Sequence, residues 1–261
     1  MSVEEVYSAF VLSDLVLPGE LTLRATDLDR LFVGVAMPTN TPLTLPDHPE
    51  TGTTRFLDRR ELGFINIGGP GVVVINGVED QIGSLDGGYI GKGTQTVAWA
   101  SNDPAHPATF FFLSCPAHET RTSAAVRRET TRTLPLGTTK EANRRVIRQY
   151  IHPDGQGSCQ LVMGYTELLE GSVWNTFPPH THNRRSEIYF YFNLGERVVA
   201  HFLGEPRATR HVFLHDGHAT LLPSWSIHSG CGQGDYCFIW GMAGENQVFR
   251  DMDAVPVLSL R

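Results

Sequence analysis

The chain has 261 residues, of which 41% are hydrophobic and 19% charged, so it can bury a core and is too long for a small disulfide-stapled scaffold. Its net charge of −7 offers no basic surface to nucleic acid, and no apolar run approaches the roughly 18 residues of a membrane helix. The amino end lacks the pattern of a signal peptide, and the four cysteines show no paired spacing. We therefore expect a cytoplasmic protein with reduced cysteines and no nucleic-acid or membrane partner.

Short runs of β-branched and aromatic residues, separated by glycine and proline, fill the first half of the chain. The runs GVVVI at 71–75, TVAWA at 96–100 and TFFFL at 109–113 are typical of strands. Asn76-Gly77 stands between GVVVI and VEDQI, and this dipeptide predicts a tight hairpin. The first half is therefore predicted to be all-β.

A charged segment at about 117–150 lacks apolar alternation and separates this half from a second β-rich half. The second half contains EIYFYF at 187–192 and YCFIWGM at 236–242, again typical of strands. We predict a barrel over 1–120, a linker with a short helix over 121–150, and a second barrel over 151–261.

The two halves share a spacing that indicates duplication. Glu61 is followed eight residues later by a glycine, and so is Glu187. Asp86-Gly87 and Asp216-Gly217 come later in the same order, each ahead of a predicted strand. The pattern favours two related β-barrels in tandem.

Four residues of the second half have the spacing of a metal site. His180 and His182 are two apart, so on a strand their side chains point to the same face. Glu187 begins the next aromatic strand, and His228 follows a proline-bearing turn. Three imidazoles and a carboxylate suit zinc, manganese, iron, nickel or cobalt. The alternative is that these are ordinary surface or core histidines, since the chain has 11.

The first half lacks the nitrogen ligands. Its Glu61 matches Glu187, and we interpret it as a structural acid paired to Arg59 or Arg60. The positions that match the three histidines are Thr54, Phe56 and Ala98. We therefore predict that the first barrel holds no metal.

The metal-site motifs resemble a known superfamily. HxH, four residues and Glu, followed by Gly217, Pro223 and His228, is similar to the two-part signature of the cupins, with departures at Trp225 and Gly232. The runs VWNTFPPHTHNRRSEIYFYFN, PSWSIHSGCG and FIWGMAGENQVFRDMD resemble the 5-keto-4-deoxyuronate isomerase family, and RRELGFINIGGPG, YIGKGT, CPAH and NRRVIRQY extend the resemblance over nearly the whole chain.

This resemblance implies an all-β fold of two tandem cupin-type jelly-roll barrels, a homo-oligomer that is a hexamer in the family, and one zinc ion per subunit. The zinc ligands would be His180, His182, Glu187 and His228. The implied activity is a ketol-isomerase of pectin and uronate breakdown, which moves a proton between two adjacent carbons of a small keto-uronate with help from the metal. Candidates for proton transfer are Glu187 and Glu245, although Glu245 is equally well explained as a loop carboxylate.

The substrate carboxylate would need a guanidinium near the metal. Arg184 and Arg185 lie between the predicted ligands, with Arg210 and Arg250 as the next candidates. The candidate substrate-binding aromatic residues are Tyr189 and Trp225. Solvated arginines and aromatic residues packed in the core are the alternative interpretations.

Three other functions stay open at this point. A related sugar-acid isomerase, such as 5-deoxyglucuronate isomerase, would use a similar bicupin. A metal-dependent dioxygenase would use the same ligands for iron. A sugar-binding module would bind metal without turnover, and fold alone does not separate these functions.

Overall fold

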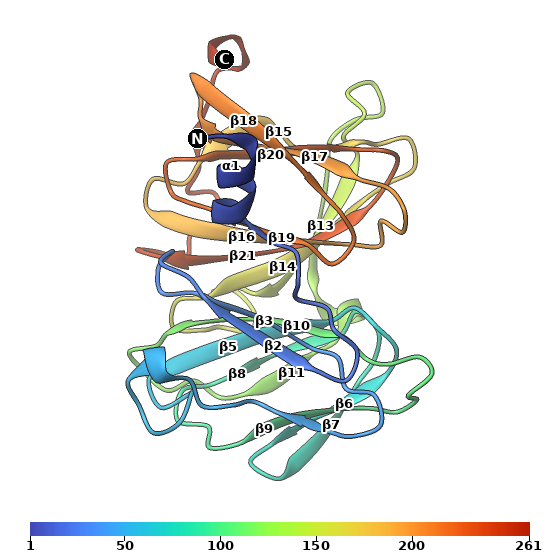
Figure 1. Ribbon diagram of the computed structural model, residues 1–261, viewed down its shortest axis with the longest axis vertical. Helices are drawn as coiled ribbons and strands as arrows, with labels where there is room; N and C mark the ends of the chain where they lie inside the picture. The colour runs from blue at the N-terminus through green and yellow to red at the C-terminus, as the bar shows by residue number, and fades with distance from the viewer. The chain divides into compact units, whose positions relative to one another are not determined.

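The computed structural model describes all 261 residues, and the chain folds into two compact β units. The first unit comprises Leu15–Thr131 and Tyr150–Val162. The second unit comprises Met1–Asp14, Arg132–Gln149 and Met163–Arg261. The predicted all-β class with two tandem units is confirmed (Figure 1), but each unit also takes in a short segment from the other half of the sequence.

The first unit is built from a six-stranded and a four-stranded antiparallel sheet. The strands of the larger sheet, in spatial order, are β11 (Ala124–Val126), β8 (Gly87–Ile90), β5 (Arg60–Asn66), β10 (Phe110–Pro116), β3 (Phe32–Ala36) and β2 (Leu21–Ala25). Those of the smaller sheet are β4 (Leu43–Thr44), β9 (Val97–Ser101), β6 (Gly71–Ile75) and β7 (Val78–Ile82). Trp99 of β9 stacks on Phe112 of β10 with ring centroids 5.3 Å apart, so the core lies between the two sheets.

The hairpin predicted at Asn76-Gly77 is confirmed. Ile75 pairs with Val78, which leaves a two-residue loop between β6 and β7. Both loop residues have positive φ, 50° for Asn76 and 83° for Gly77, the turn geometry that asparagine and glycine tolerate best.

The second unit also has two antiparallel sheets. The seven-stranded sheet runs β1 (Val11–Leu12), β19 (Ala219–Leu222), β16 (Arg185–Phe192), β21 (Cys237–Gly244), β14 (Val162–Leu168), β13 (Arg145–Ile151) and β12 (Arg132–Leu136). The five-stranded sheet runs β18 (Ala208–Leu214), β17 (Val199–Glu205), β20 (Ile227–Gly232), β15 (Trp174–Thr181) and β22 (Asp253–Ala254). Three short 3-10 turns complete the secondary structure of the chain: η1 (Pro49–Thr51), η2 (Arg128–Thr130) and η3 (Val257–Ser259).

The amino-terminal segment belongs to the second unit through strand pairing. Helix α1 (Val3–Phe10) begins with a capping box in which Ser2 and Glu5 satisfy each other's backbone N–H groups. Val11 of β1 then pairs with Thr220 of β19, and the helix packs on β18 and β19 (Figure 1, blue helix beside orange strands). This pairing joins residues from opposite ends of the sequence.

The predicted linker with a short helix over 121–150 is wrong. This range contains β11, β12 and most of β13, and its only helical piece is the three-residue η2 turn. Most of the charged residues that suggested a linker lie in the turns between these strands, and β11 and β12 are edge strands, where one side meets solvent and apolar alternation is weak. No helix of the chain is long and apolar enough to cross a membrane.

Candidate metal centre

An irregular strand places His180, and His182 follows directly after its last residue. β15 pairs with β20 at Trp174 and Asn175, then shifts register, and pairs again where His180 lies opposite His228. The segment between contains Pro178 and Pro179, which cannot donate to a strand ladder. The register shift therefore brings His180 and His228 together as direct cross-strand neighbours.

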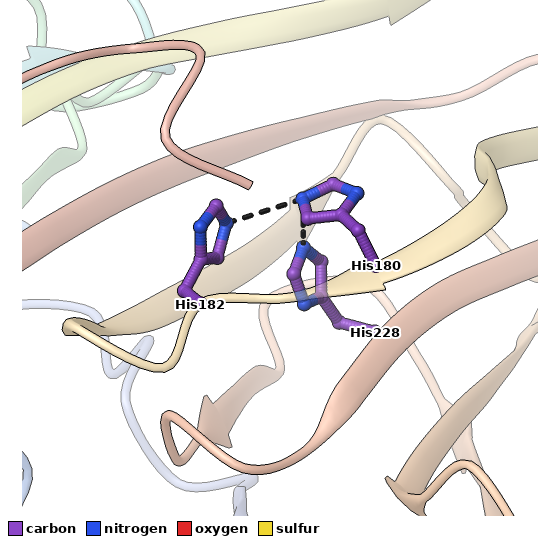
Figure 2. A group of neighbouring side chains, drawn as sticks. All are labelled: His180, His182 and His228. Carbon is purple, nitrogen blue, oxygen red and sulfur yellow. Dashed lines mark hydrogen bonds between the residues drawn. The ribbon is translucent and has the colours of Figure 1, made fainter. Parts of the chain in front are cut away.

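The three histidines converge on one point between the two sheets (Figure 2). Nε2 of His180 lies 3.2 Å from Nε2 of His182 and 3.1 Å from Nε2 of His228. Oε2 of Glu187, which comes from the opposing sheet, lies 3.2 Å from Nε2 of His182 and 3.1 Å from Nε2 of His228. The structure therefore brings together all four residues that the sequence predicted as ligands.

These separations fit a bound transition metal. Zinc–nitrogen bonds of about 2.0–2.1 Å in a tetrahedron place neighbouring donor atoms about 3.3 Å apart. Burial lowers the pKa of His180 to about 3 and holds that of His228 well below its usual value, with neighbouring charges as the smaller cause. Neutral imidazoles are the form that binds metal. Oε2 of Glu187 is buried and accepts no well-aligned hydrogen bond, so a cation would compensate its desolvated charge.

Backbone carbonyl groups orient two of the imidazoles. Nδ1 of His182 lies 3.0 Å from the carbonyl oxygen of Asp251 and donates to it, which leaves the lone pair on Nε2 facing the cluster. His228 makes a backbone hydrogen bond with Ser226. Such outer contacts fix the tautomer and ring orientation of metal-binding histidines.

A cavity of about 280 Å³ opens onto His180, His182 and Glu187, close to the lower end of the range for small-ligand pockets. One wall is the inward face of four neighbouring strands, β16, β21, β14 and β13. The other residues that line it are Leu136, Arg145, Ile147, Thr166, Thr176, Phe177, Pro178, Tyr189, Phe238, Trp240, Met242, Phe249 and Met252. The cavity is therefore mostly apolar, with few polar groups beside the cluster.

Tyr189 is the predicted substrate-binding residue that lines this cavity. Its hydroxyl lies 2.9 Å from Oγ1 of Thr176. Burial is the main reason that the pKa of Tyr189 lies well above its ordinary value, and the charge of Glu187 adds to it. The tyrosine therefore stays protonated and can donate a hydrogen bond.

Four predicted substrate and catalytic residues, Arg184, Arg185, Trp225 and Glu245, lie outside the cavity lining. Arg184 binds the carboxylates of Asp251 and Asp253. Arg185 is 1% exposed, and its Nη2 donates to the Asp251 carbonyl oxygen at 2.6 Å. Trp225 is half-exposed and meets the ring of Phe10, and Glu245 is exposed.

Sequence reasoning missed Arg145 and Thr176. Arg145 fell in the predicted linker, although the β-branched and aromatic residues of RVIRQYI could have indicated a strand. Thr176 has a φ of 48°, so no periodic pattern places its side chain in the cavity.

The matching acid of the first unit has a different environment. Glu61 is fully buried and accepts hydrogen bonds from the hydroxyl of Tyr89 at 2.7 Å and from the backbone N–H groups of Cys159, Gln160 and Leu161 at 2.6–2.8 Å. The expected pairing with Arg59 or Arg60 is absent, since the Arg60 guanidinium binds Ser114 and the Arg30 carbonyl oxygen. Glu61 is thus a structural acid that holds the 159–161 backbone.

The chain is similar to several known proteins. A 4-deoxy-L-threo-5-hexosulose-uronate ketol-isomerase from Opitutus terrae is 51% identical over 259 residues, covering 99% of this chain and 94% of that protein. One from Caldicellulosiruptor bescii is 44% identical, covering 100% and 95%. The crystal structure of an IolB-like protein from Salmonella typhimurium superposes with a TM-score of 0.77 at 13% identity, covering 94% of this chain and 96% of that chain, and so supports the predicted fold.

The family model described as "KduI/IolB family" matches residues 26–256, which include both units and all four residues of the cluster. With this match and relatives at 44–51% identity over nearly the whole length, the chain belongs to the KduI/IolB family.

Proposed function

We propose that this protein is a metal-dependent ketol-isomerase of uronate degradation. Its substrate would be 5-keto-4-deoxyuronate, the open-chain 5-keto aldehyde that forms from unsaturated uronates. Its product would be 3-deoxy-D-glycero-2,5-hexodiulosonate. The observation that carries the proposal is the convergence of three imidazole nitrogens and one carboxylate oxygen, 3.1–3.2 Å apart, at a cavity of the size of a small sugar acid.

The reaction requires few groups. A proton leaves C2 and a proton is delivered to C1, while the hydroxyl proton of O2 is replaced by one on O1, so no atom is gained or lost. A divalent metal held by the cluster would supply Lewis-acid polarisation of the substrate carbonyl. The chain supplies the ligands that hold it, which we propose to be His180, His182, Glu187 and His228.

Two residues that line the cavity can transfer or donate protons. Glu187 is the only acidic side chain that lines the cavity, so we assign it the transfer between the two carbons. Tyr189, kept protonated by burial and held by Thr176, can donate to a substrate oxygen that gains negative charge. Glu245 is exposed and receives no role.

Apolar side chains exclude water from the reacting carbons. Trp240, Phe238 and Phe177 form much of the cavity wall. A dry wall strengthens each electrostatic contact and limits side reactions of the enediolate.

We further propose zinc as the resident metal, because it holds nitrogen and oxygen ligands in a tetrahedron and this isomerisation needs no redox change. Three further points stay predictions from the sequence and from its resemblance to the isomerase family. They are one metal ion per chain in the second unit, no metal ion in the first unit, and a hexameric assembly. Cytoplasmic location is likewise a prediction from the sequence.

A side-by-side assay separates the proposal from the nearest alternative, a 5-deoxyglucuronate isomerase. The purified protein should convert 5-keto-4-deoxyuronate at least 100-fold more efficiently than 5-deoxyglucuronate. The reverse preference would assign the second activity. Oxygen consumption with the iron-loaded protein, without isomerisation, would instead assign a dioxygenase.

A further inference from the structure

The cavity contains one cation that no acidic side chain neutralises. Arg145 is the only lysine or arginine among the lining residues. Its guanidinium makes one hydrogen bond within the chain, from Nη1 to the carbonyl oxygen of Asn143 at 2.9 Å, and no salt bridge. Burial lowers the pKa of Arg145 because desolvation disfavours its charge. A desolvated guanidinium with unused N–H donors is stabilised when an anion binds to it.

The neighbouring arginines are already engaged. Arg184 is held by Asp251 and Asp253, and Arg185 is buried behind His182 with its Nη2 on the Asp251 carbonyl oxygen. Neither lines the cavity. The carboxylate-binding role expected of this pair from the sequence therefore falls more naturally on Arg145.

The position of Arg145 suits a ligand that also reaches the histidine cluster. Arg145 and Ile147 face the cavity from β13, and Glu187 faces it from β16. Two strands, β21 and β14, lie between them, so the two backbones are about 14 Å apart at about 4.8 Å per strand. The Arg145 side chain spans part of that width, and its charge acts on His180. An open-chain six-carbon acid can span the remaining distance between Arg145 and the histidine cluster.

We propose that Arg145 binds the carboxylate of the substrate and thereby directs its aldehyde end toward the histidine cluster. This inference rests on the proposed function. A guanidinium and a carboxylate form a charge-assisted, bidentate pair, and the apolar wall around Arg145 strengthens it. A neutral sugar would leave the guanidinium unpaired, so Arg145 selects acids over neutral sugars.

Equilibrium binding tests the inference independently of turnover. The probes are 5-keto-D-gluconate and L-sorbose, which differ only in a carboxylate against a hydroxymethyl group at one end. Calorimetry compares the unaltered protein with Arg145→Met, Arg145→Lys and the control Arg144→Met. Arg144 is an exposed neighbour, so its substitution makes the same charge change without touching the cavity.

We expect Arg145→Met to weaken binding of 5-keto-D-gluconate by about 10- to 100-fold, the loss typical of a charge-assisted pair, and to leave L-sorbose binding unchanged. Arg145→Lys should recover part of the loss, and Arg144→Met should bind both probes normally. Metal content and circular dichroism of every variant should match the unaltered protein, which excludes misfolding as the cause.

Two results would overturn the inference: equal loss of both probes in Arg145→Met, or normal acid binding in that variant. Failure of the unaltered protein to prefer the acid would overturn it as well. If acid binding depends on Arg145 but 5-keto-4-deoxyuronate is not isomerised, the Arg145 assignment stands and the proposed function fails.

Discussion

Nε2 of His228 lies 3.1 Å from Oε2 of Glu187, although His228 belongs to the five-stranded sheet and Glu187 to the seven-stranded sheet of the second unit. The contact joins the two sheets through a carboxylate that lacks a well-aligned hydrogen-bond donor. Without a cation the buried charge opposes folding, and with a cation it helps to hold the sheets together. Metal binding and the stability of this unit should therefore be coupled.

The substitution Glu187→Gln tests this coupling. In metal-free protein it should raise the free energy of unfolding by about 1–3 kcal/mol, because an amide carries no charge and can donate to a neutral imidazole. In metal-loaded protein it should lower stability and metal affinity, because a ligand charge is lost. Urea unfolding of both forms gives the comparison. Destabilisation of equal size in both forms would contradict the role of Glu187 as a ligand.

Replacing both His180 and His182 with alanine should empty the metal site. Two of four donors are lost, whereas the sheets keep their hydrogen bonds. Metal analysis should fall from about one ion per chain to near zero while circular dichroism stays β-rich. The matched control is His211→Ala together with His215→Ala, two histidines outside the cluster. Full metal content in the His180/His182 variant would refute the assignment.

Glu61 should contribute to folding stability and not to metal binding. Glu61→Gln puts an N–H donor where the chain presents three backbone N–H donors and the Tyr89 hydroxyl. We expect a loss of at least about 2 kcal/mol in the free energy of unfolding, since a buried set of donors is left unsatisfied. Metal content measured per folded chain should not change. A zinc soak that reveals an anomalous peak beside Glu61 would disprove the metal-free prediction for this unit.

The buried His201 should make stability depend on pH. It is fully buried, its Nδ1 lies 2.8 Å from the Tyr191 hydroxyl, and burial lowers its pKa to about 3. The unfolded chain binds a proton at this histidine near pH 6.5, so stability is lost as pH falls from 6.5 toward 3. Between pH 7 and pH 5 this costs about 2 kcal/mol.

His201→Asn should remove that part of the pH dependence. The metal-free protein is the right material, because it keeps proton uptake by the metal ligands the same in both variants. Urea unfolding at pH 7 and pH 5 gives the difference, which should be about 2 kcal/mol smaller in the variant. An unchanged difference would show that His201 titrates normally in the folded state.

Local rules made part of the cluster predictable from the sequence. HxH places His182 two residues after His180, just past the end of β15, and the turn residues before Glu187 and His228 set where each strand begins. The Asn76-Gly77 hairpin was predictable for the same reason. The approach of His228 and Glu187 to the HxH pair depends on strand pairing, and the resemblance to the cupin signature is what indicated it.

The features that the sequence did not predict depend on contacts between segments that are far apart in the chain. Nothing local in Val11 indicates Thr220 as its partner, so the exchange of segments between units stayed hidden. The sequence suggested Arg184 as a partner of the substrate carboxylate. It did not indicate that Asp251 and Asp253 approach Arg184 from β22 and the segment before it. Arg145 was overlooked because charged residues before and within β13 gave this segment the composition of a linker.

Proton NMR of 5-keto-4-deoxyuronate incubated with the protein tests the central claim most directly. With the metal-loaded protein the aldehyde signal should disappear as 3-deoxy-D-glycero-2,5-hexodiulosonate appears. The chelated protein should be inactive, and added zinc should restore turnover in the unaltered chain but not in the variant lacking His180 and His182. Undiminished conversion after complete metal removal, or no conversion by the zinc-loaded protein, would contradict the account.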